Sequence, residues 1–457
     1  MKSDCADGAC QANFKNTRRF ASRATGTDKV LTKTSDRSET QNVGSLRHVA
    51  AVGVGNALEF YDFLTFSFFA VQIGHAFFPA SETSHGLLYA LATFGIGFIT
   101  RPLGGLVLGA YGDRVGRKPA MLLSFTLMGV AILGLALTPG YATIGIAAPI
   151  LLVLFRLVQG FALGGEVGPS TAFLMEVAPT HRRGLYIGLQ MATQDLAVLV
   201  AGIVGLVLSL LMPPAMLDAW GWRVAFLLGA LILPFGLILR RSLPETFEAS
   251  ERGASPRLPI RNHARVVVLG TLMLGASTIA YYGIEYLNTY AQDTLQLSAK
   301  VAFGTTMLLG FVMVITDVLC GLLTDRVGRR PVMITAAVCV VLVIAPAFTL
   351  LNQYPGAGLL FAVTAILGIL SALISGPALI AVTESLPRQV RSGLLGALYA
   401  VAMTLFGGTT QFVSRGLIDL TDNPVAPAFY ITGAMVIGIV CMVLLGETAP
   451  ARVSRKD

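Results

Sequence analysis

Five charged residues stand inside long apolar stretches of this 457-residue sequence, and they are the first candidates for chemistry. They are Glu59, Asp62, Arg156, Glu166 and Asp195. A charged side chain in the middle of a membrane span costs roughly 2.5–3.5 kcal/mol on insertion scales. Such residues therefore usually pair with one another or face a water-filled cavity, and they often bind ions or substrates.

Glu59 and Asp62 have the chemistry of proton carriers. They stand three residues apart, so on a helix they are neighbours on one face. Burial and mutual repulsion both favour a bound proton on at least one of the two carboxyl groups. A structural pair that is hydrogen-bonded to Asn56, or to an arginine of another span, is the alternative.

Arg156 has the chemistry of an anion anchor. Its guanidinium stays charged and presents a planar fork that binds a carboxylate through two hydrogen bonds. Gln159 lies one helical turn away and shares its face. The alternative is a permanent salt bridge to Glu166, Asp195 or an acid of the first span. We expect Arg156 and Gln159 to contact the substrate.

The other two buried acids are candidates for the proton pathway. Glu166 follows Gly164-Gly165, and small residues of this kind let helices pack closely. A packing role and a proton-relay role are both open for Glu166. Asp195 lies in the middle of a later apolar stretch, and we expect that it can pair with Arg156.

An aromatic and acidic face occurs in the second half of the chain. Tyr282, Glu285 and Tyr286 are spaced i, i+3 and i+4, so a helix brings them together. We expect this face to line the mouth of a cavity and to contact substrate. An ordinary belt of interfacial tyrosines would have the same composition.

One charged stretch occurs twice, 212 residues apart, at Gly109–Pro119 and Gly321–Pro331. Both copies share the pattern D-R-V-G-R-[KR]-P between two apolar runs. We expect an apolar helix to end at the Asp, Gly to provide a tight turn, and Pro to start the next helix. The pattern predicts a hinge that sets the rate of conformational exchange, with these gate residues: Asp113, Arg114, Arg117, Asp325, Arg326 and Arg329.

Other charges are expected to support these junctions. Arg101 precedes a Pro near the end of the second span, and Asp317 stands eight residues before Asp325. A second repeat, Glu176–Gly184 and Glu384–Gly393, places an acid, a Pro, an Arg and a Gly after the fourth and tenth spans. We interpret this repeat as a structural clasp that is held by charge pairs.

Composition and periodicity define the elements that must position these residues. Hydrophobic residues make up 54% of the chain and charged residues 13%, against about 25% charged in soluble domains. Each apolar stretch approaches the ~20 residues that a spanning helix needs. The sequence predicts an all-α membrane protein with twelve transmembrane helices in two pseudo-symmetric six-helix halves, at about 49–74, 86–110, 119–138, 146–173, 185–211, 223–240, 265–290, 301–323, 331–351, 358–383, 392–414 and 426–446.

The polar segments divide the chain and orient it. We expect a disordered cytoplasmic extension over 1–46, a first half over 47–240, a cytoplasmic linker over 241–264, a second half over 265–447 and a cytoplasmic tail over 448–457. Lys and Arg concentrate in alternate connections, which places those connections and both termini in the cytoplasm.

The repeated stretch resembles the hallmark of the major facilitator superfamily. More narrowly, the chain resembles the metabolite:proton symporters of that superfamily, through segments in both halves. The segments that carry this resemblance are Gly55–Phe63, Arg101–Gly105, Arg156–Gly160, Gly164–Glu166, Trp220–Arg223 and Leu239–Thr246. Small departures are Phe60, where Trp is common, and Ala225, where Pro usually follows W-G-W-R.

The resemblance implies a secondary transporter of the inner cell membrane that carries a small organic acid, of the citrate or dicarboxylate class, together with protons. The expected partners are that acid, protons and the lipid bilayer, in a monomer, with no nucleic acid, cofactor, metal or enzymatic activity. The alternatives are uptake of a zwitterionic osmolyte such as proline or betaine, and proton-coupled export of a metabolite or drug.

Overall fold

The computed structural model describes residues 56–57, 60–78, 83–115, 117–164, 167–242, 263–387 and 391–449, and the side chains of most of these. The chain divides into two units, residues 1–50 and 51–457, and the described residues belong to the second. Several expectations lie outside the described residues. They concern the extension over 1–46, most of the linker, the end of the tail, Glu59, Glu166, and the side chains of Asp113 and Arg117.

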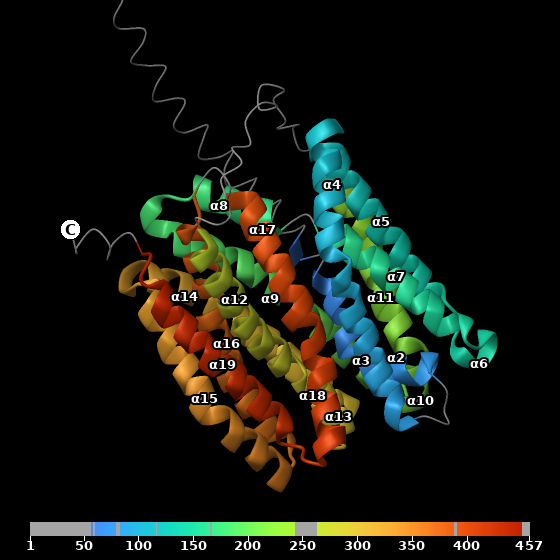
Figure 1. Cartoon of the computed structure of the whole chain (residues 1–457). Helices are drawn as coiled ribbons and strands as arrows, with labels where there is room; N and C mark the ends of the chain where they lie inside the picture. Colours follow the sequence, from blue (N-terminus) through green and yellow to red (C-terminus); the bar gives the residue numbers. More distant parts are fainter. Residues whose placement is uncertain are drawn as a thin grey trace, which may run out of the picture. The chain divides into compact units, whose positions relative to one another are not determined.

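Helices coincide with all six spans predicted for the first half (Figure 1). Short helices α6 (Tyr141–Ile144) and α10 (Pro214–Met216) lie in two of the connections. The long helices are residues 60–68 with α2 (Ala70–Phe77), α3 (Thr83–Ile99) with α4 (Arg101–Val115), α5 (Arg117–Leu137), α7 (Ala147–Leu163) with α8 (Val167–Val177), α9 (Arg183–Leu211) and α11 (Trp222–Ser242).

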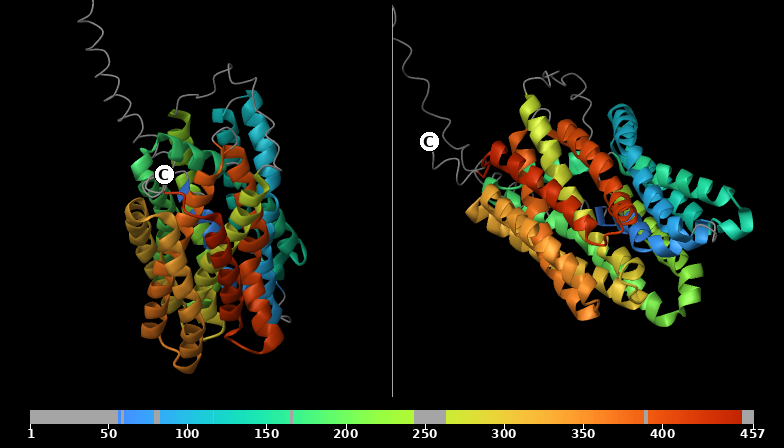
Figure 2. Two further views of the ribbon diagram at one scale, coloured as in Figure 1. Left: turned by 60° about the vertical axis from the view of Figure 1, so that its left-hand side comes forward. Right: turned by 60° about the horizontal axis from the view of Figure 1, so that its bottom comes forward.

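The second half follows the same order, and its helices lie beside those of the first in the views of Figure 2. They are α12 (Ala264–Glu285) with α13 (Leu287–Asp293), α14 (Ala299–Val327), α15 (Arg329–Gln353), α16 (Ala357–Ser385), α17 (Arg391–Ala402) with α18 (Gly408–Thr421), and α19 (Ala426–Leu445). Within the described ranges, eight helices are long and apolar enough to cross a membrane, and two more are apolar but shorter.

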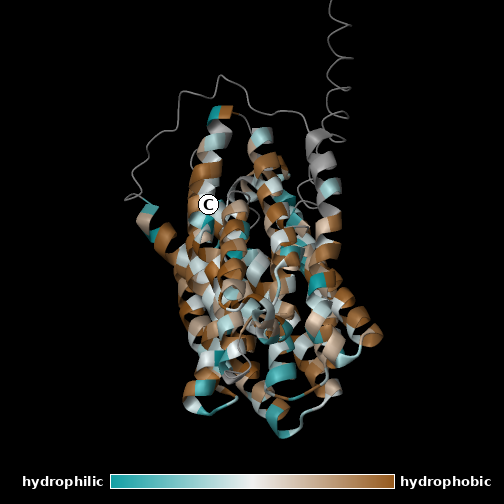
Figure 3. Ribbon diagram, turned by 90° about the vertical axis from the view of Figure 1, so that its right-hand side faces the viewer, coloured by the Kyte–Doolittle hydropathy of each residue, from teal (hydrophilic) through white to brown (hydrophobic). Residues whose placement is uncertain are grey.

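The helices are apolar on their outer faces as well as in their core. Large apolar side chains such as Leu106, Leu211 and Phe429 are exposed, while Arg156 and Gln159 are 0% exposed. Apolar residues run along the helices, and polar ones gather at the turns in the lower part of Figure 3. Extended exposed apolar surface of this kind is typical of contact with lipid. Helices suit that setting because they satisfy their own backbone hydrogen bonds.

The repeated stretch differs from the prediction in one respect. The expectation that the helix ends at the Asp is wrong for both copies, because α4 continues through Asp113 to Val115 and α14 continues through Asp325 to Val327. Gly328 then turns the chain with φ 106°, a conformation that a residue without a Cβ adopts readily. Asp325 is therefore held rigidly in the last turn of a helix.

The largest contact between the halves is made by α9 and α14, which pack antiparallel. Gly184 faces Gly321 at one end, and Gly202 faces Met307 further along. Between them, a Cβ on Gly310 would overlap the backbone nitrogen of Leu199. Small residues at such crossings let two helix backbones approach closely inside a membrane.

A π-helical turn, Met403–Gly407, separates α17 from α18. Such turns are rare and occur frequently at functional sites. Within it, Thr404 Oγ1 donates a hydrogen bond to the backbone oxygen of Phe98, at 2.9 Å. Beyond it, Gly408 approaches the backbone of Gly95 on α3, so this segment forms a second contact between the halves.

Replacing Gly310 by Ala should lower the thermal stability of the purified protein. The added methyl group has no space against Leu199, and overpacking of this kind costs about 1–3 kcal/mol. Gly433→Ala is the matched control, because a Cβ there meets no atom within 4 Å. Thermal unfolding followed by tryptophan fluorescence measures both variants. Equal melting temperatures would show that the α9–α14 contact does not limit stability.

Candidate functional site

A chain of hydrogen bonds joins three of the predicted site residues. Arg156 Nη1 on α7 donates to Gln159 Oε1 at 2.9 Å, and Gln159 Nε2 donates to Asp62 Oδ2 at 2.8 Å. All three side chains are buried. Gln159 thus connects the predicted anion anchor to a predicted proton carrier, and Asp62, an acid of the first span, interacts electrostatically with Arg156.

Phenylalanine rings surround the guanidinium of Arg156. Its Cζ lies 4.4 Å from the ring centroid of Phe63 and 4.3 Å from that of Phe66. Arg101 was expected at a loop junction, but its Cζ lies 4.3 Å from Phe63 and 4.2 Å from Phe98. Rings at these distances attract cations through their negative faces. Two guanidinium groups therefore converge on Phe63, close enough to repel each other.

Some donor and acceptor atoms of the Arg156 cluster make no hydrogen bond within the described part of the chain. Among the described residues, Arg156 Nε, Arg156 Nη2 and Asp62 Oδ1 have no hydrogen-bond partner. Buried polar atoms of proteins are nearly always paired. Two donors on one guanidinium, in the absence of a partner in the described part of the chain, suit a carboxylate ligand.

The predicted face of the second half separates into three environments. Tyr282 joins the Arg156 cluster, with its ring 5.7 Å from Phe98 and edge-on to it. Glu285 lies near Asp195, and Tyr286 lies against Tyr290 with ring centroids 6.1 Å apart. Because all three are buried, the expectation of a cavity mouth is not met in this conformation.

Asp195 does not pair with Arg156 in this structure. It accepts a hydrogen bond of 2.8 Å from Tyr281 Oη on α12, and its carboxyl group lies within hydrogen-bonding reach of Asp317. The expectation that Asp317 belongs to the repeated stretch is wrong, because a side chain two helical turns before Asp325 reaches the middle of α9 instead.

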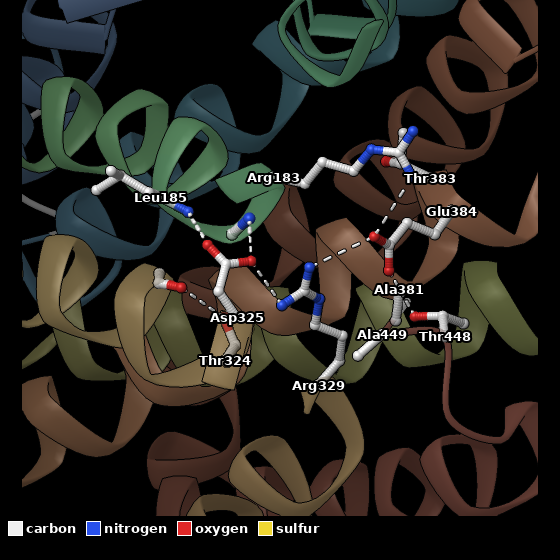
Figure 4. A network of polar contacts seen from close by, with 12 residues as sticks. Arg183, Leu185, Thr324, Asp325, Arg329, Ala381, Thr383, Glu384, Thr448 and Ala449 are labelled. Carbon is white, nitrogen blue, oxygen red and sulfur yellow. Dashed lines mark hydrogen bonds and ion pairs between the residues drawn. The ribbon is translucent and has the colours of Figure 1, made fainter. Parts of the chain in front are cut away.

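A second polar cluster lies at the end of the helices where the repeated stretch occurs (Figure 4). Asp325 accepts backbone hydrogen bonds from Gly184 at 2.8 Å and Leu185 at 3.0 Å, at the N-terminus of α9. Arg329 Nη1 lies 2.9 Å from Asp325 Oδ1. A carboxylate suits the positive end of a helix dipole, so Asp325 binds the first half from the second.

Glu384 extends this cluster. Its Oε1 lies 3.4 Å from Arg329 Nη2 and 3.9 Å from Arg183 Nη1. We call Arg183, Asp325, Arg329 and Glu384 the motif-end network (Figure 4). Two of its members come from the second repeat, the predicted clasp. Of the other predicted gate residues, Arg114 and Arg326 are exposed.

Sequence reasoning missed two polar residues beside this network. Glu447 accepts backbone hydrogen bonds from Arg329 at 3.0 Å and Arg330 at 3.2 Å, and so caps α15. Thr448 donates to Glu384 Oε2 at 2.8 Å. A signal was present, because Glu447-Thr448 after the last span repeats Glu245-Thr246 after the sixth. The sequence did not single out the phenylalanines around Arg156, because they lie within uniformly apolar runs.

With this geometry established, comparison with known proteins identifies the family. The sequence pattern of the Major Facilitator Superfamily matches residues 53–405. The chain belongs to this superfamily and is therefore a membrane transporter rather than an enzyme. The predicted fold class, twelve transmembrane helices in two pseudo-symmetric halves, is confirmed.

Similar proteins of known activity narrow the class. The chain is 35% identical to a citrate-proton symporter of Klebsiella pneumoniae, over 87% of this chain and 90% of that protein. It is 35% identical to an alpha-ketoglutarate permease of Escherichia coli, over 91% and 97%. A proline/betaine transporter of Escherichia coli is 31% identical, over 89% and 84%. The predicted resemblance to metabolite:proton symporters is confirmed.

Solved structures agree on the fold. A crystal structure of a D-xylose-proton symporter superimposes with a TM-score of 0.69, covering 89% of this chain and 98% of that one. Its sequence identity is 19%, so this similarity bears on the fold alone.

Replacing Asp325 by Asn should destabilise the motif-end network. Asn keeps an oxygen that can accept one backbone hydrogen bond but loses the charge that faces Arg329 and the α9 dipole, which we expect to cost about 1–2 kcal/mol. Asp422→Asn is the control, because Asp422 is exposed and has a left-handed backbone that Asn tolerates. If both variants melt at the wild-type temperature, the Asp325 cap contributes nothing to stability.

Proposed function

We propose that this protein carries a small organic acid of the citrate or dicarboxylate class, together with protons, by alternating access. The observation that carries the proposal is the convergence of Arg101 and Arg156 on Phe63, with Asp62 as the described acid nearby. The buried Arg156 Nε and Nη2, which have no hydrogen-bond partner in the described part of the chain, favour a carboxylate-bearing substrate. The names of the citrate-proton and alpha-ketoglutarate relatives support the same class.

In this proposal, Arg156 binds a carboxylate of the substrate through Nη2 and Nε. Gln159 holds the guanidinium in place from the other side through its 2.9 Å hydrogen bond. Tyr282 closes the cluster from the second half, since its ring contacts Phe94 and Phe98. Because both halves contribute residues to this site, it is complete only when the halves lie together there, as alternating access requires.

Proton coupling follows from the competition for Arg156. An ionised Asp62 attracts the same guanidinium that the substrate needs, through the Gln159 bridge. A proton on Asp62 removes that competing charge, so proton and substrate bind more strongly together than apart. Glu59, which stands three residues before Asp62 in the sequence, Glu166 and Asp195 remain further candidates for the proton pathway.

The motif-end network is proposed as the gate. It ties α9 of the first half to α14 and α16 of the second, and its contacts must break when the halves separate at that end. We assign this end to the cytoplasm, with both termini on the same side of the inner membrane and a monomer as the working unit. Asp325→Asn should accordingly change turnover more than substrate affinity.

A zwitterionic osmolyte is the second candidate. A quaternary ammonium group suits an aromatic cage such as Phe63, Phe66, Phe94 and Phe98. Here, however, the faces of Phe63, Phe66 and Phe98 already hold guanidinium groups. The arginines therefore favour the organic acid over the osmolyte.

Uptake into proteoliposomes tests the proposed function. Purified protein is assayed with citrate, 2-oxoglutarate, shikimate and betaine, with and without an imposed pH gradient. We expect a carboxylate to accumulate against its gradient only when the pH gradient is present. Accumulation of betaine alone, or accumulation of an acid that ignores the pH gradient, would contradict the proposal.

Comparing Arg156→Lys with Arg156→Ala separates a substrate anchor from a structural cation. Lys keeps the charge and loses the fork, so a substrate anchor should lose about 1.5–3 kcal/mol of binding, which is roughly a tenfold or greater rise in KM. Ala leaves Gln159 and Asp62 without their cation and should also lower thermal stability.

The preference among the acids of the panel is the decisive measurement for Arg156→Lys. A lysine that restores wild-type KM values and the wild-type order of preference would make Arg156 a structural residue and place the anion site elsewhere.

A further inference from the structure

A pair of buried acids lies where the halves meet, outside the Arg156 cluster. Asp195 stands on α9 of the first half and Asp317 on α14 of the second, with 3% and 2% of their surfaces exposed. Both helices belong to the close glycine-lined contact, in which Gly188 faces the backbone oxygen of Asp317. The two helix backbones are therefore too close for the carboxyl groups to move apart freely.

The two carboxyl groups lie within hydrogen-bonding reach of each other. An ionised carboxylate only accepts hydrogen bonds, so two ionised groups cannot bond to each other. Two like charges at that separation in a water-poor interior also repel strongly. One proton between Asp195 and Asp317 would account for this arrangement.

Among the described residues, the surroundings supply no positive charge that could replace this proton. Tyr281 on α12 donates to Asp195, Glu285 on α12 adds a third carboxyl group, and Cys320 lies one turn along α14 from Asp317. On α16, which packs on both helices, Glu384 is already paired with Arg329. Neither Asp195 nor Asp317 contacts an Arg, Lys or His in the described ranges.

Unused acceptor atoms point to the same conclusion. In the described part of the chain, Asp317 Oδ2 and both carboxyl oxygens of Glu285 lack a hydrogen-bond partner, although the side chains are buried. An ionised carboxylate in such a place would carry the full cost of its lost hydration. Neutral, protonated carboxyl groups avoid most of that cost.

We propose that Asp195 and Asp317 share one proton and form a proton-binding site that bridges the two halves of the transporter. The inference rests on the proposed function and adds Asp317, which is not among the predicted proton carriers. Loss of the proton leaves two carboxylates facing each other across the α9–α14 contact, and the repulsion favours separation of the halves. Binding and release of one proton then accompany each closing and opening of this contact.

Infrared spectroscopy of the purified full-length protein in lipid tests whether the proton is there. Wild type at neutral pH should show the C=O stretching band of a buried protonated carboxyl group. Asp317→Asn and Asp195→Asn should each lose intensity in that band, because the amide donates to the remaining carboxylate and no proton is needed. Asp422→Asn, an exposed acid, is the control and should leave the band unchanged.

Transport tests whether the pair takes part in the cycle. Because the amide keeps a hydrogen bond across the contact, Asp317→Asn should fold, as its melting temperature will show. It should retain exchange of internal for external citrate but lose pH-driven accumulation, with about one proton fewer moved per substrate. Asp422→Asn should accumulate citrate as wild type does.

The outcomes separate this inference from the proposed function. An unchanged infrared band in both variants would overturn the shared proton, whatever the protein transports. A lost band with undiminished pH-driven accumulation would overturn a role in the cycle. Accumulation that follows a sodium gradient and is abolished in both variants would make the pair a sodium site. If wild type transports no acid of the panel, the proposed function fails, while the infrared result still decides whether the pair holds a proton.

Discussion

A charge buried among these helices is stabilised by a partner on a different helix, and the structure depends on this constraint. Asp325 binds the N-terminus of α9 from the end of α14, and Asp62 reaches Arg156 through a glutamine on α7. Each such contact fixes one helix relative to another at a defined level. Apolar packing against lipid-like surroundings has no comparable directionality, because lipid tails are as apolar as Leu.

The contacts between the halves differ in chemistry along the molecule. At the motif end the contacts are between charged groups. In the middle a tyrosine bonds to an acid, and another tyrosine packs on the phenylalanine rings that surround the arginines. Elsewhere the contacts are close backbone approaches at glycines. Charged and protonated contacts can be switched by a proton or an anion, whereas glycine contacts cannot. The close contacts of Gly202 and Gly310, at the far end of the α9–α14 packing from the motif-end network, therefore suit a pivot, and the polar clusters suit the parts that open and close.

Much of the fold was predictable because spanning helices need long apolar stretches, and all twelve predicted stretches contain helix. The Arg156–Gln159 pair was predictable because i and i+3 share a helix face. The partners of Asp195 and Asp317 were not, because their meeting depends on the register between α9 and α14, which glycine spacing alone does not reveal. The position of Arg101 was predicted wrongly because its neighbours Phe63 and Phe98 cannot be told from other apolar residues in the sequence.

The π-helical turn Met403–Gly407 adds about one residue to a helix that would otherwise repeat every 3.6. That residue rotates everything beyond it by about 100° relative to an uninterrupted helix. The segment can therefore present one stripe to α8 through Gly396, and a differently aimed stripe to α3 through Gly408 and to Ser67 through Gln411. The helix formed by α17 and α18 thus contains a shift in helical phase, which lets it contact α8 and α3 with differently oriented faces.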